Sequence, residues 1–307
     1  MWHHDLMWHY KMRDVMKQVF LVILLAFGFV AGAQNKIVKK PKKQKPATTQ
    51  VPPKKHKSQS NSRKGGTVKR VATKASYSNG TLTVNGIKYN MVWVDGGTFR
   101  MGATSEQGSD AWDDEKPVHS VTLSGYYIGK TEVTQALWKA VMGSNPSNFK
   151  GDDLPVDQVS WNDCQEFIRK LNALTGQHFR LPTEAEWEFA CRGGNNSRGY
   201  KYSGSNDIDN VAWYWDNSGK KTHPVATKSP NELGIYDMSG NVMEWCSDWY
   251  GKYSSGAQTN PKGPYDGSSR VFRGGSWSFG AWRFRSSFRF SGSPGDRCYE
   301  LGLRLSL

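Results

Sequence analysis

Apolar and polar residues alternate in the first part of residues 77–307, a pattern that predicts short β-strands joined by tight turns. The apolar positions of Thr81–Val84 and Ile87–Val94 lie on one face of each strand, and Asn85-Gly86 separates the two segments. Asn-Gly between alternating segments is a strong hairpin signal. Residues 118–128 repeat the pattern around Ser124-Gly125, so we expect a second pair of strands there.

Helical spacing follows the strands, with three clear helix starts. Each start has a Ser or Thr that can cap the helix, and two of the three also have an acidic residue three positions later, as in a capping box. The expected helices run from Thr134 through Met142, from Ser160 through Leu174, and from Thr183 to Cys191. Beyond residue 194 we expect aromatic-rich loops and short strands, for example at 270–273 and 302–305. Helices in one half and strands in the other predict an α+β fold.

Residues 1–33 read as a signal peptide. Basic residues precede a run of about twelve apolar residues at 19–30, and Ala31-Gly32-Ala33 is a small-residue cleavage site. A membrane-spanning helix is the alternative, but it requires roughly 20 apolar residues. We therefore expect a secreted or periplasmic protein of a cell envelope, with no transmembrane helix after processing.

The formal net charge of +14 comes from one segment of the chain. Residues 34–75 contain 14 Lys and Arg and no Asp or Glu, whereas residues 76–307 contain 24 basic and 25 acidic residues. Segment 34–76 is also poor in large apolar residues, so it is expected to be a disordered basic linker. Its charge favours contact with an anionic envelope surface, and a plain spacer is the alternative. We expect no nucleic-acid partner and a single folded domain at 77–307.

A series of short phrases in fixed order carries a family resemblance. The phrases are 91–94 (MVWV), 96–102 (GGTFRMG), 115–119 (EKPVH), 130–134 (KTEVT), 159–163 (VSWND), 180–188 (RLPTEAEWE), 231–245 (NELGIYDMSGNVMEW) and 273–277 (RGGSW). This series resembles the formylglycine-generating, or sulfatase-modifying factor, family from about residue 88 to the end. The resemblance implies a C-type-lectin-like fold with little regular secondary structure.

The same resemblance implies a calcium site at Asp237, Gly240, Val242 and Glu244. Two carboxylates and two backbone carbonyls on one turn match the oxygen ligands that calcium prefers. The alternative is that both carboxylates accept hydrogen bonds from neighbouring backbone amides. Loss of calcium dependence on changing Glu244 to Ala would separate the two.

The position of the catalytic cysteines differs from the family. Family oxidases bind copper through two cysteines that follow a Gly-Gly-Ser-aromatic phrase, and thiolates suit copper(I). In this chain Phe279 and Phe284 occupy both cysteine positions. A phenyl ring has no sulfur ligand, so copper is not expected and the chain is predicted to be a pseudoenzyme. Ser276 has no neighbouring His in the sequence that would make it a nucleophile.

The segment after these glycines is rich in aromatic residues, Arg and small residues, the composition of binding surfaces. We expect it to bind a protein, peptide or glycan. Core packing is the alternative for the rings, and it is the preferred interpretation for Phe284 and Phe288. The expected ligand-binding residues are Ser276, Trp277, Ser278, Phe279, Trp282, Arg283, Arg285, Arg289 and Tyr299.

The four cysteines, Cys164, Cys191, Cys246 and Cys298, match no zinc spacing. One or two disulfides and buried free thiols both remain open, and the pairing cannot be deduced from the sequence. Three functions are compatible with the sequence: a noncatalytic binding or assembly module, a maturation oxidase that forms formylglycine by an atypical route, and a structural envelope subunit.

Overall fold

The computed structural model describes residues 73–307. The expected signal peptide and nearly all of the expected linker lie outside the described residues. Strand β1 (Ala75–Ser78) begins two residues before the expected domain boundary at Tyr77 and pairs with β2 (Thr81–Val84). No helix in the described residues is long and apolar enough to cross a bilayer.

The predicted hairpin between β2 and β3 (Ile87–Val94) is confirmed. Asn85 and Gly86 adopt positive φ angles of 50° and 85°, which suit the two central positions of a tight hairpin turn. Strand β6 (Tyr126–Gly129) completes this sheet, whose order is β1-β2-β3-β6.

The second expected strand pair forms differently. β5 (His119–Leu123) and β6 flank Ser124-Gly125, but they belong to two sheets and do not pair with each other. β5 instead pairs with β4 (Gly97–Met101) and with the two-residue strand β8 (Gln258–Thr259). A local turn signal therefore located the chain reversal, while packing against distant strands decided the partners.

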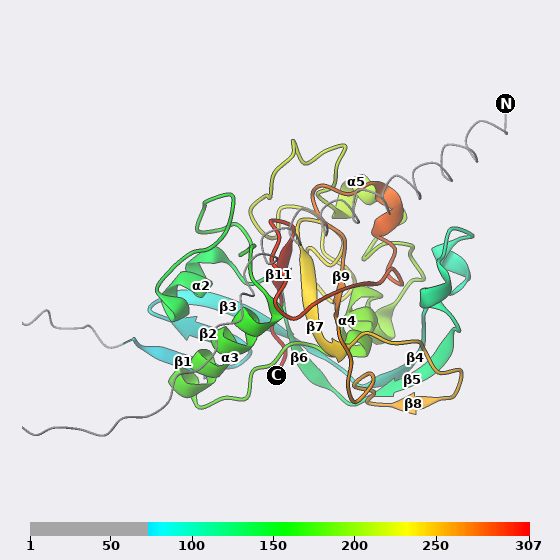
Figure 1. The fold of residues 1–307 in the computed structure, drawn as a ribbon, viewed down its shortest axis with the longest axis horizontal. Coiled ribbons are helices and arrows are strands. Elements are labelled where there is room, and N and C mark those ends of the chain that lie inside the picture. Colours follow the sequence, from blue (N-terminus) through cyan, green and yellow to red (C-terminus); the bar gives the residue numbers. More distant parts are fainter. Residues whose placement is uncertain (1–72) are drawn as a thin grey trace, which may run out of the picture. The chain divides into compact units, whose positions relative to one another are not determined.

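The third sheet contains the C-terminal strands in the order β10-β9-β7-β11. These are β10 (Phe290–Gly292), β9 (Arg270–Arg273), β7 (Met243–Trp249) and β11 (Leu301–Leu303). β7 and β9 lie at the centre of the domain beside α4, and β11 runs parallel to β7 (Figure 1).

The three predicted helices are confirmed with their caps. α2 (Gln135–Met142), α3 (Trp161–Thr175) and α4 (Glu184–Cys191) have Thr134, Ser160 and Thr183 as N-caps, and each cap side chain accepts a backbone N–H. Short helical segments that we did not expect are α5 (Ile208–Val211) and the 3₁₀ turns η1 (Ser105–Gln107), η2 (Asp113–Glu115), η3 (Gly194–Asn196) and η4 (Ala281–Arg283). Segments this short carry too few residues for a periodic signal.

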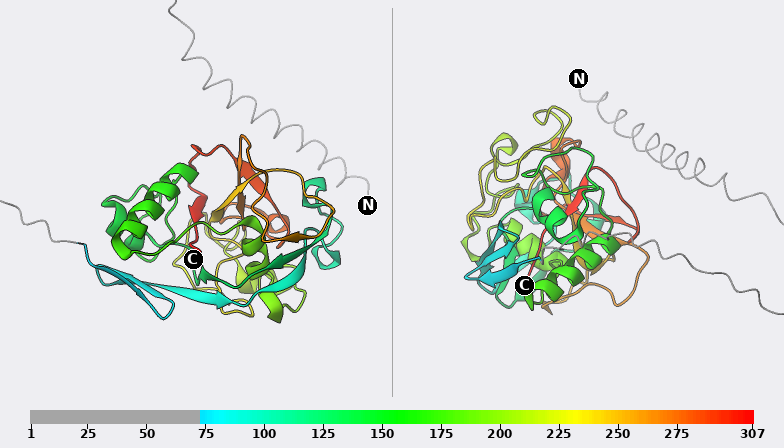
Figure 2. Two further views of the ribbon diagram at one scale, coloured as in Figure 1. Left: turned by 90° about the horizontal axis from the view of Figure 1, so that it is seen from below. Right: turned by 90° about the vertical axis from the view of Figure 1, so that its left-hand side faces the viewer.

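Two groups of buried side chains hold these elements together. α2 and α3 pack on β1, β2 and β3, and the rings of Trp138 and Phe167 stack between them with centroids 4.9 Å apart (Figures 1 and 2). α4 packs on β7 and β9 through the fully buried Trp187. The α+β prediction is thus confirmed, and β9 and β10 flank the segment expected to bind ligands.

Candidate ligand-binding site

The chain leaves β9 through a glycine turn. Gly274 and Gly275 have φ angles of 103° and 73°, and a Cβ on Gly275 would lie 2.9 Å from the ring of Phe284. Glycine is required here by both backbone conformation and space. The turn places Ser276 in the interior, where its Oγ lies 3.2 Å from Ser278 Oγ. Ser276 contacts another hydroxyl and no base, so it is not activated as a nucleophile.

Both residues at the copper-binding positions of the family pack as hydrophobic side chains. Phe284 is 1% exposed and lies in a buried cluster with Tyr202 and Tyr214. Phe279 is half-buried, and its ring centroid lies 5.5 Å from that of Phe290. The predicted core role of Phe284 is confirmed, as it is for Phe288, which is 2% exposed.

The four cysteines are all free, and no disulfide is present in residues 73–307. Burial raises the pKa of the Cys191 thiol to about 11 and that of the Cys298 thiol to about 12. It also raises the pKa values of Cys164 and Cys246 well above the ordinary range. Since the thiolate is the nucleophilic form, burial keeps these thiols in their less reactive, protonated state.

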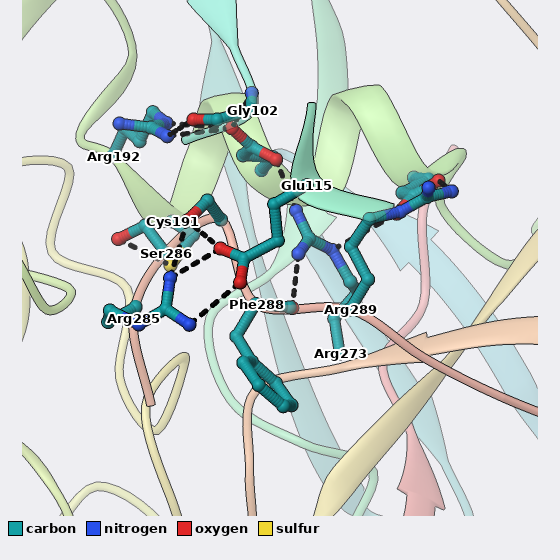
Figure 3. Close-up of polar contacts among 12 residues, drawn as sticks. Gly102, Glu115, Cys191, Arg192, Arg273, Arg285, Ser286, Phe288 and Arg289 are labelled. Atoms are coloured by element: carbon teal, nitrogen blue, oxygen red, sulfur yellow. Dashed lines mark hydrogen bonds and ion pairs between the residues drawn. The ribbon is translucent and has the colours of Figure 1, made fainter. Parts of the chain in front are cut away.

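Arg285 was expected to contact a ligand, but it lies inside the protein. Its guanidinium forms a two-pronged ion pair with Glu115 of η2, and both side chains are fully buried (Figure 3). Burial opposes the charge on Glu115, but hydrogen bonds from Arg285 and Ser287 lower the pKa of this carboxyl below its ordinary value. Arg285 therefore ties the aromatic segment to a loop 170 residues earlier in the chain.

Arg289 was also expected to contact a ligand, but it too lies inside the protein. Its Nε and Nη2 donate to the two carboxylate oxygens of Glu184 at 2.6 and 2.7 Å, and Arg289 is 3% exposed. Arg273, at the end of β9, pairs with Glu188 of α4 in the same region (Figure 3). The sequence identified the arginines but not their acidic partners, which come from segments far away in the chain.

Five of the expected ligand-binding residues reach the surface, and two of them, Phe279 and Trp282, contact Arg283. Trp282 and Tyr299 are 40% and 46% exposed, and Ser278, Phe279 and Arg283 are half-buried. Trp277 is only 7% exposed, and its indole N–H donates to the backbone carbonyl of Tyr299 at 3.1 Å. Trp277 therefore supports the surface and does not form much of it.

Two exposed tryptophans outside the expected set adjoin this surface. Trp112 is 45% exposed and packs against Trp282, with ring centroids 5.5 Å apart. Trp215 is 51% exposed, and its backbone N–H donates to the Phe279 carbonyl at 3.1 Å. Their sequence neighbourhoods contain no signal for this placement, because only the fold brings η2 and the 212–219 loop beside the C-terminal segment. We call Trp112, Trp215, Phe279, Trp282 and Arg283 the aromatic face.

The four residues of the expected calcium site are close together in sequence, but Glu244 is already engaged. Both of its carboxylate oxygens accept from Arg304, and Oε2 also accepts from the Trp187 indole N–H at 2.7 Å. Asp237 accepts from the Ala226 backbone N–H at 2.7 Å, and its burial raises its pKa to about 6.

No group of three or more His, Cys, Asp or Glu side chains among residues 73–307 is arranged to hold a metal. In this arrangement Glu244 does not fit as a calcium ligand, because Arg304 neutralises its charge. Calcium binding at Asp237, Gly240, Val242 and Glu244 stays a prediction that requires Glu244 to release Arg304.

Comparisons with known sequences identify related proteins of different descriptions. "Chaperone protein LppX" of Paenibacillus barcinonensis is 36% identical over 238 residues, which span 61% of this chain and 78% of that protein. The "Formylglycine-generating enzyme" of Streptomyces coelicolor is 31% identical over 283 residues, which span 69% of this chain and 87% of the enzyme.

Solved structures with a similar fold also include proteins of different descriptions. "Treponema denticola variable protein 1" is 36% identical with a TM-score of 0.66, covering 74% of this chain and 97% of that one. PvdO from Pseudomonas aeruginosa is 25% identical with a TM-score of 0.60, covering 70% and 93%. The sequence model described as "Sulfatase-modifying factor enzyme 1-like domain" matches residues 82–307. The chain therefore belongs to the sulfatase-modifying factor, or formylglycine-generating enzyme, domain family.

Proposed function

We propose that this protein is a noncatalytic member of its family that acts as a binding or assembly module. The observation that carries the proposal is the pair of phenyl rings at 279 and 284, where family oxidases hold copper through sulfur. Phe284 is fully packed and Phe279 contacts Phe290, so neither position offers a metal ligand. Without a soft ligand pair, the segment has no evident means to activate oxygen.

The aromatic face supports a binding role. Large exposed rings beside an Arg are the residue types that dominate the energy of protein interfaces. Three of the seven large, exposed hydrophobic side chains of residues 73–307 belong to this face: Trp112, Trp215 and Trp282. The description of one relative as a chaperone is consistent with recognition of another protein.

A peptide oxidation assay tests the absence of catalysis. The protein is incubated with copper, oxygen and a peptide that contains the sulfatase core Cys-x-Pro-x-Arg, and the aldehyde is measured by mass spectrometry. The Streptomyces coelicolor enzyme serves as the positive control. We expect no aldehyde above the background without protein. Turnover by this chain would show that it is a maturation oxidase that works by an atypical route.

We further propose that the protein is exported and acts in the cell envelope. The apolar run at 19–30 and the cleavage signal at 31–33 support export, and the charge of residues 34–75 supports contact with an anionic surface. Pull-down from envelope extract with the full chain and with a chain lacking residues 34–75 tests this. Partners retained without the basic segment support recognition by the domain, whereas complete loss would favour a structural subunit tethered through its tail.

A further inference from the structure

Arg283 differs from the other arginines of the C-terminal segment. Arg273, Arg285, Arg289, Arg297 and Arg304 each form an ion pair with a carboxylate within 4.0 Å. Arg270 stacks on Trp161 and Trp249 and donates to the Ser247 carbonyl. Within residues 73–307, Arg283 alone in this segment has neither an ion pair nor a side-chain hydrogen bond. The N–H groups of its guanidinium therefore donate to no protein group among these residues.

Aromatic rings hold the Arg283 guanidinium in place. Its central carbon lies 4.5 Å from the ring centroids of both Phe279 and Trp282 and 5.4 Å from that of Phe290. Such contacts fix the orientation of the guanidinium without using its N–H groups. None of its nitrogens is among the enclosed, partnerless side-chain atoms of the described residues, so the donors are open to solvent. The Arg283 guanidinium therefore has a fixed orientation, is partly shielded from water, and can donate N–H groups to one planar anion.

Glu300 does not form an ion pair with Arg283. Burial lowers the pKa of the Arg283 guanidinium, and the negative charge of Glu300 offsets this lowering only in part. The Glu300 carboxylate instead accepts a hydrogen bond from Ser278 Oγ. Glu300 consequently repels an incoming anion while leaving the guanidinium free.

The surroundings favour a carboxylate on a peptide. A guanidinium fork matches a carboxylate through two parallel hydrogen bonds. The exposed rings of Trp112 and Trp282 pack together beside this guanidinium, and exposed aromatic rings next to an Arg are typical anchors of protein and peptide interfaces. Residues 76–307 carry a net charge of −1, so the domain as a whole does not favour docking on an anionic membrane.

We propose that Arg283 is the specificity anchor of the aromatic face and binds an Asp or Glu side chain of a partner peptide, with apolar neighbours of that residue lying against Trp112 and Trp282. The proposal rests on the binding function proposed above and adds the chemical class of the ligand. Arg283 touches the ligand directly and takes part in no reaction.

A displayed library of random peptides provides the test. The full chain is the bait, and excess free peptide of residues 34–75 absorbs sequences that bind the basic segment. Selected peptides are then titrated while tryptophan emission is followed, because Trp282 contacts Arg283 and Trp112 packs against Trp282. Melting curves of every variant show whether it is folded.

We expect enrichment of Asp or Glu beside aromatic or aliphatic residues. Arg283→Gln should weaken these peptides on the order of tenfold, the effect of losing one charge-assisted contact. Arg297→Gln, which removes an exposed arginine paired with Asp163, should bind like the wild type. Glu300→Gln should strengthen binding because it removes a repelling charge.

The outcomes separate the two proposals. Peptides that bind and are weakened by Trp282→Ala, but lack acidic residues or ignore Arg283→Gln, would overturn the anchor and leave the binding module standing. A uronic-acid oligosaccharide that binds through Arg283 while peptides do not would overturn the peptide assignment. Absence of any binding sensitive to Trp282→Ala would overturn the binding function together with the anchor.

Discussion

Arg285 provides the sharpest test of the distinction between structural and ligand-binding arginines. We expect Arg285→Met to unfold more easily than the wild type by about 3–5 kcal/mol, the usual cost of removing one partner of a buried ion pair. The reason is that Glu115, fully buried, keeps only the Ser287 hydroxyl and the Trp112 backbone N–H as hydrogen-bond donors. The variant tests a contact between η2 and the C-terminal segment that the sequence did not reveal.

The assay is urea denaturation followed by circular dichroism, with Arg297→Met as the matched control. Arg297 pairs with Asp163 at the surface, where its side chain is 53% exposed, so its loss should cost less than about 1 kcal/mol. The double variant Glu115→Gln with Arg285→Met should be more stable than Arg285→Met alone, since no unpaired charge remains buried. A midpoint for Arg285→Met within error of the control would refute the structural role.

The pH dependence of this difference follows from Glu115. Its pKa in the folded protein lies below the ordinary value of 4.5, mainly because the donors from Arg285 and Ser287 outweigh burial. A depressed pKa contributes stability above the unfolded value, and that stability is lost as the pH falls through the folded value. In Arg285→Met the carboxyl accepts a proton more readily. The difference in free energy of unfolding between the wild type and Arg285→Met should therefore become smaller below about pH 4.5.

Three further predictions concern other parts of the domain. Burial, reinforced by Glu184, raises the pKa of Asp248 to about 7, so the folded protein keeps a proton that the unfolded chain releases above about pH 4. The stabilising contribution of Asp248 is present at acid pH and is lost by about pH 7. Asp248→Asn should remove this pH dependence and raise the free energy of unfolding by up to about 4 kcal/mol at pH 8 in denaturant titrations. Parallel pH profiles of the wild type and the variant would contradict the prediction. Phe284→Ala should lower the free energy of unfolding by about 3–5 kcal/mol because it leaves a cavity. Trp282→Ala should lower it far less, because Trp282 is 40% exposed in the wild type. Equal losses of stability in thermal melts would contradict the packing of Phe284. If Glu244 releases Arg304 and binds calcium together with Asp237, a chelator should lower the melting temperature and added calcium should restore it. An unchanged melting curve would contradict the predicted calcium site.

The local features of this protein could be predicted from the sequence. Thr134, Ser160 and Thr183 cap the helices as expected, and Asn85-Gly86 forms the expected hairpin, because a cap or a tight turn is decided by a few neighbouring residues. The ordered phrases identified the family for the same reason, since each is a contiguous run of residues. The substitution of both copper-binding cysteines by Phe279 and Phe284 is also a property of the sequence alone.

The partners of the strands and of the charged side chains were decided only by the tertiary structure. The composition of the segment predicted that Arg283, Arg285 and Arg289 share one binding surface. In the structure Arg285 and Arg289 point inward to Glu115 and Glu184. Those carboxylates lie 170 and 105 residues away in the sequence, and no local pattern encodes such a distance. Arg283 remains open because aromatic rings, and not a carboxylate, surround it. The sequence determined which side chains are available, and packing determined which of them are left free to bind a partner.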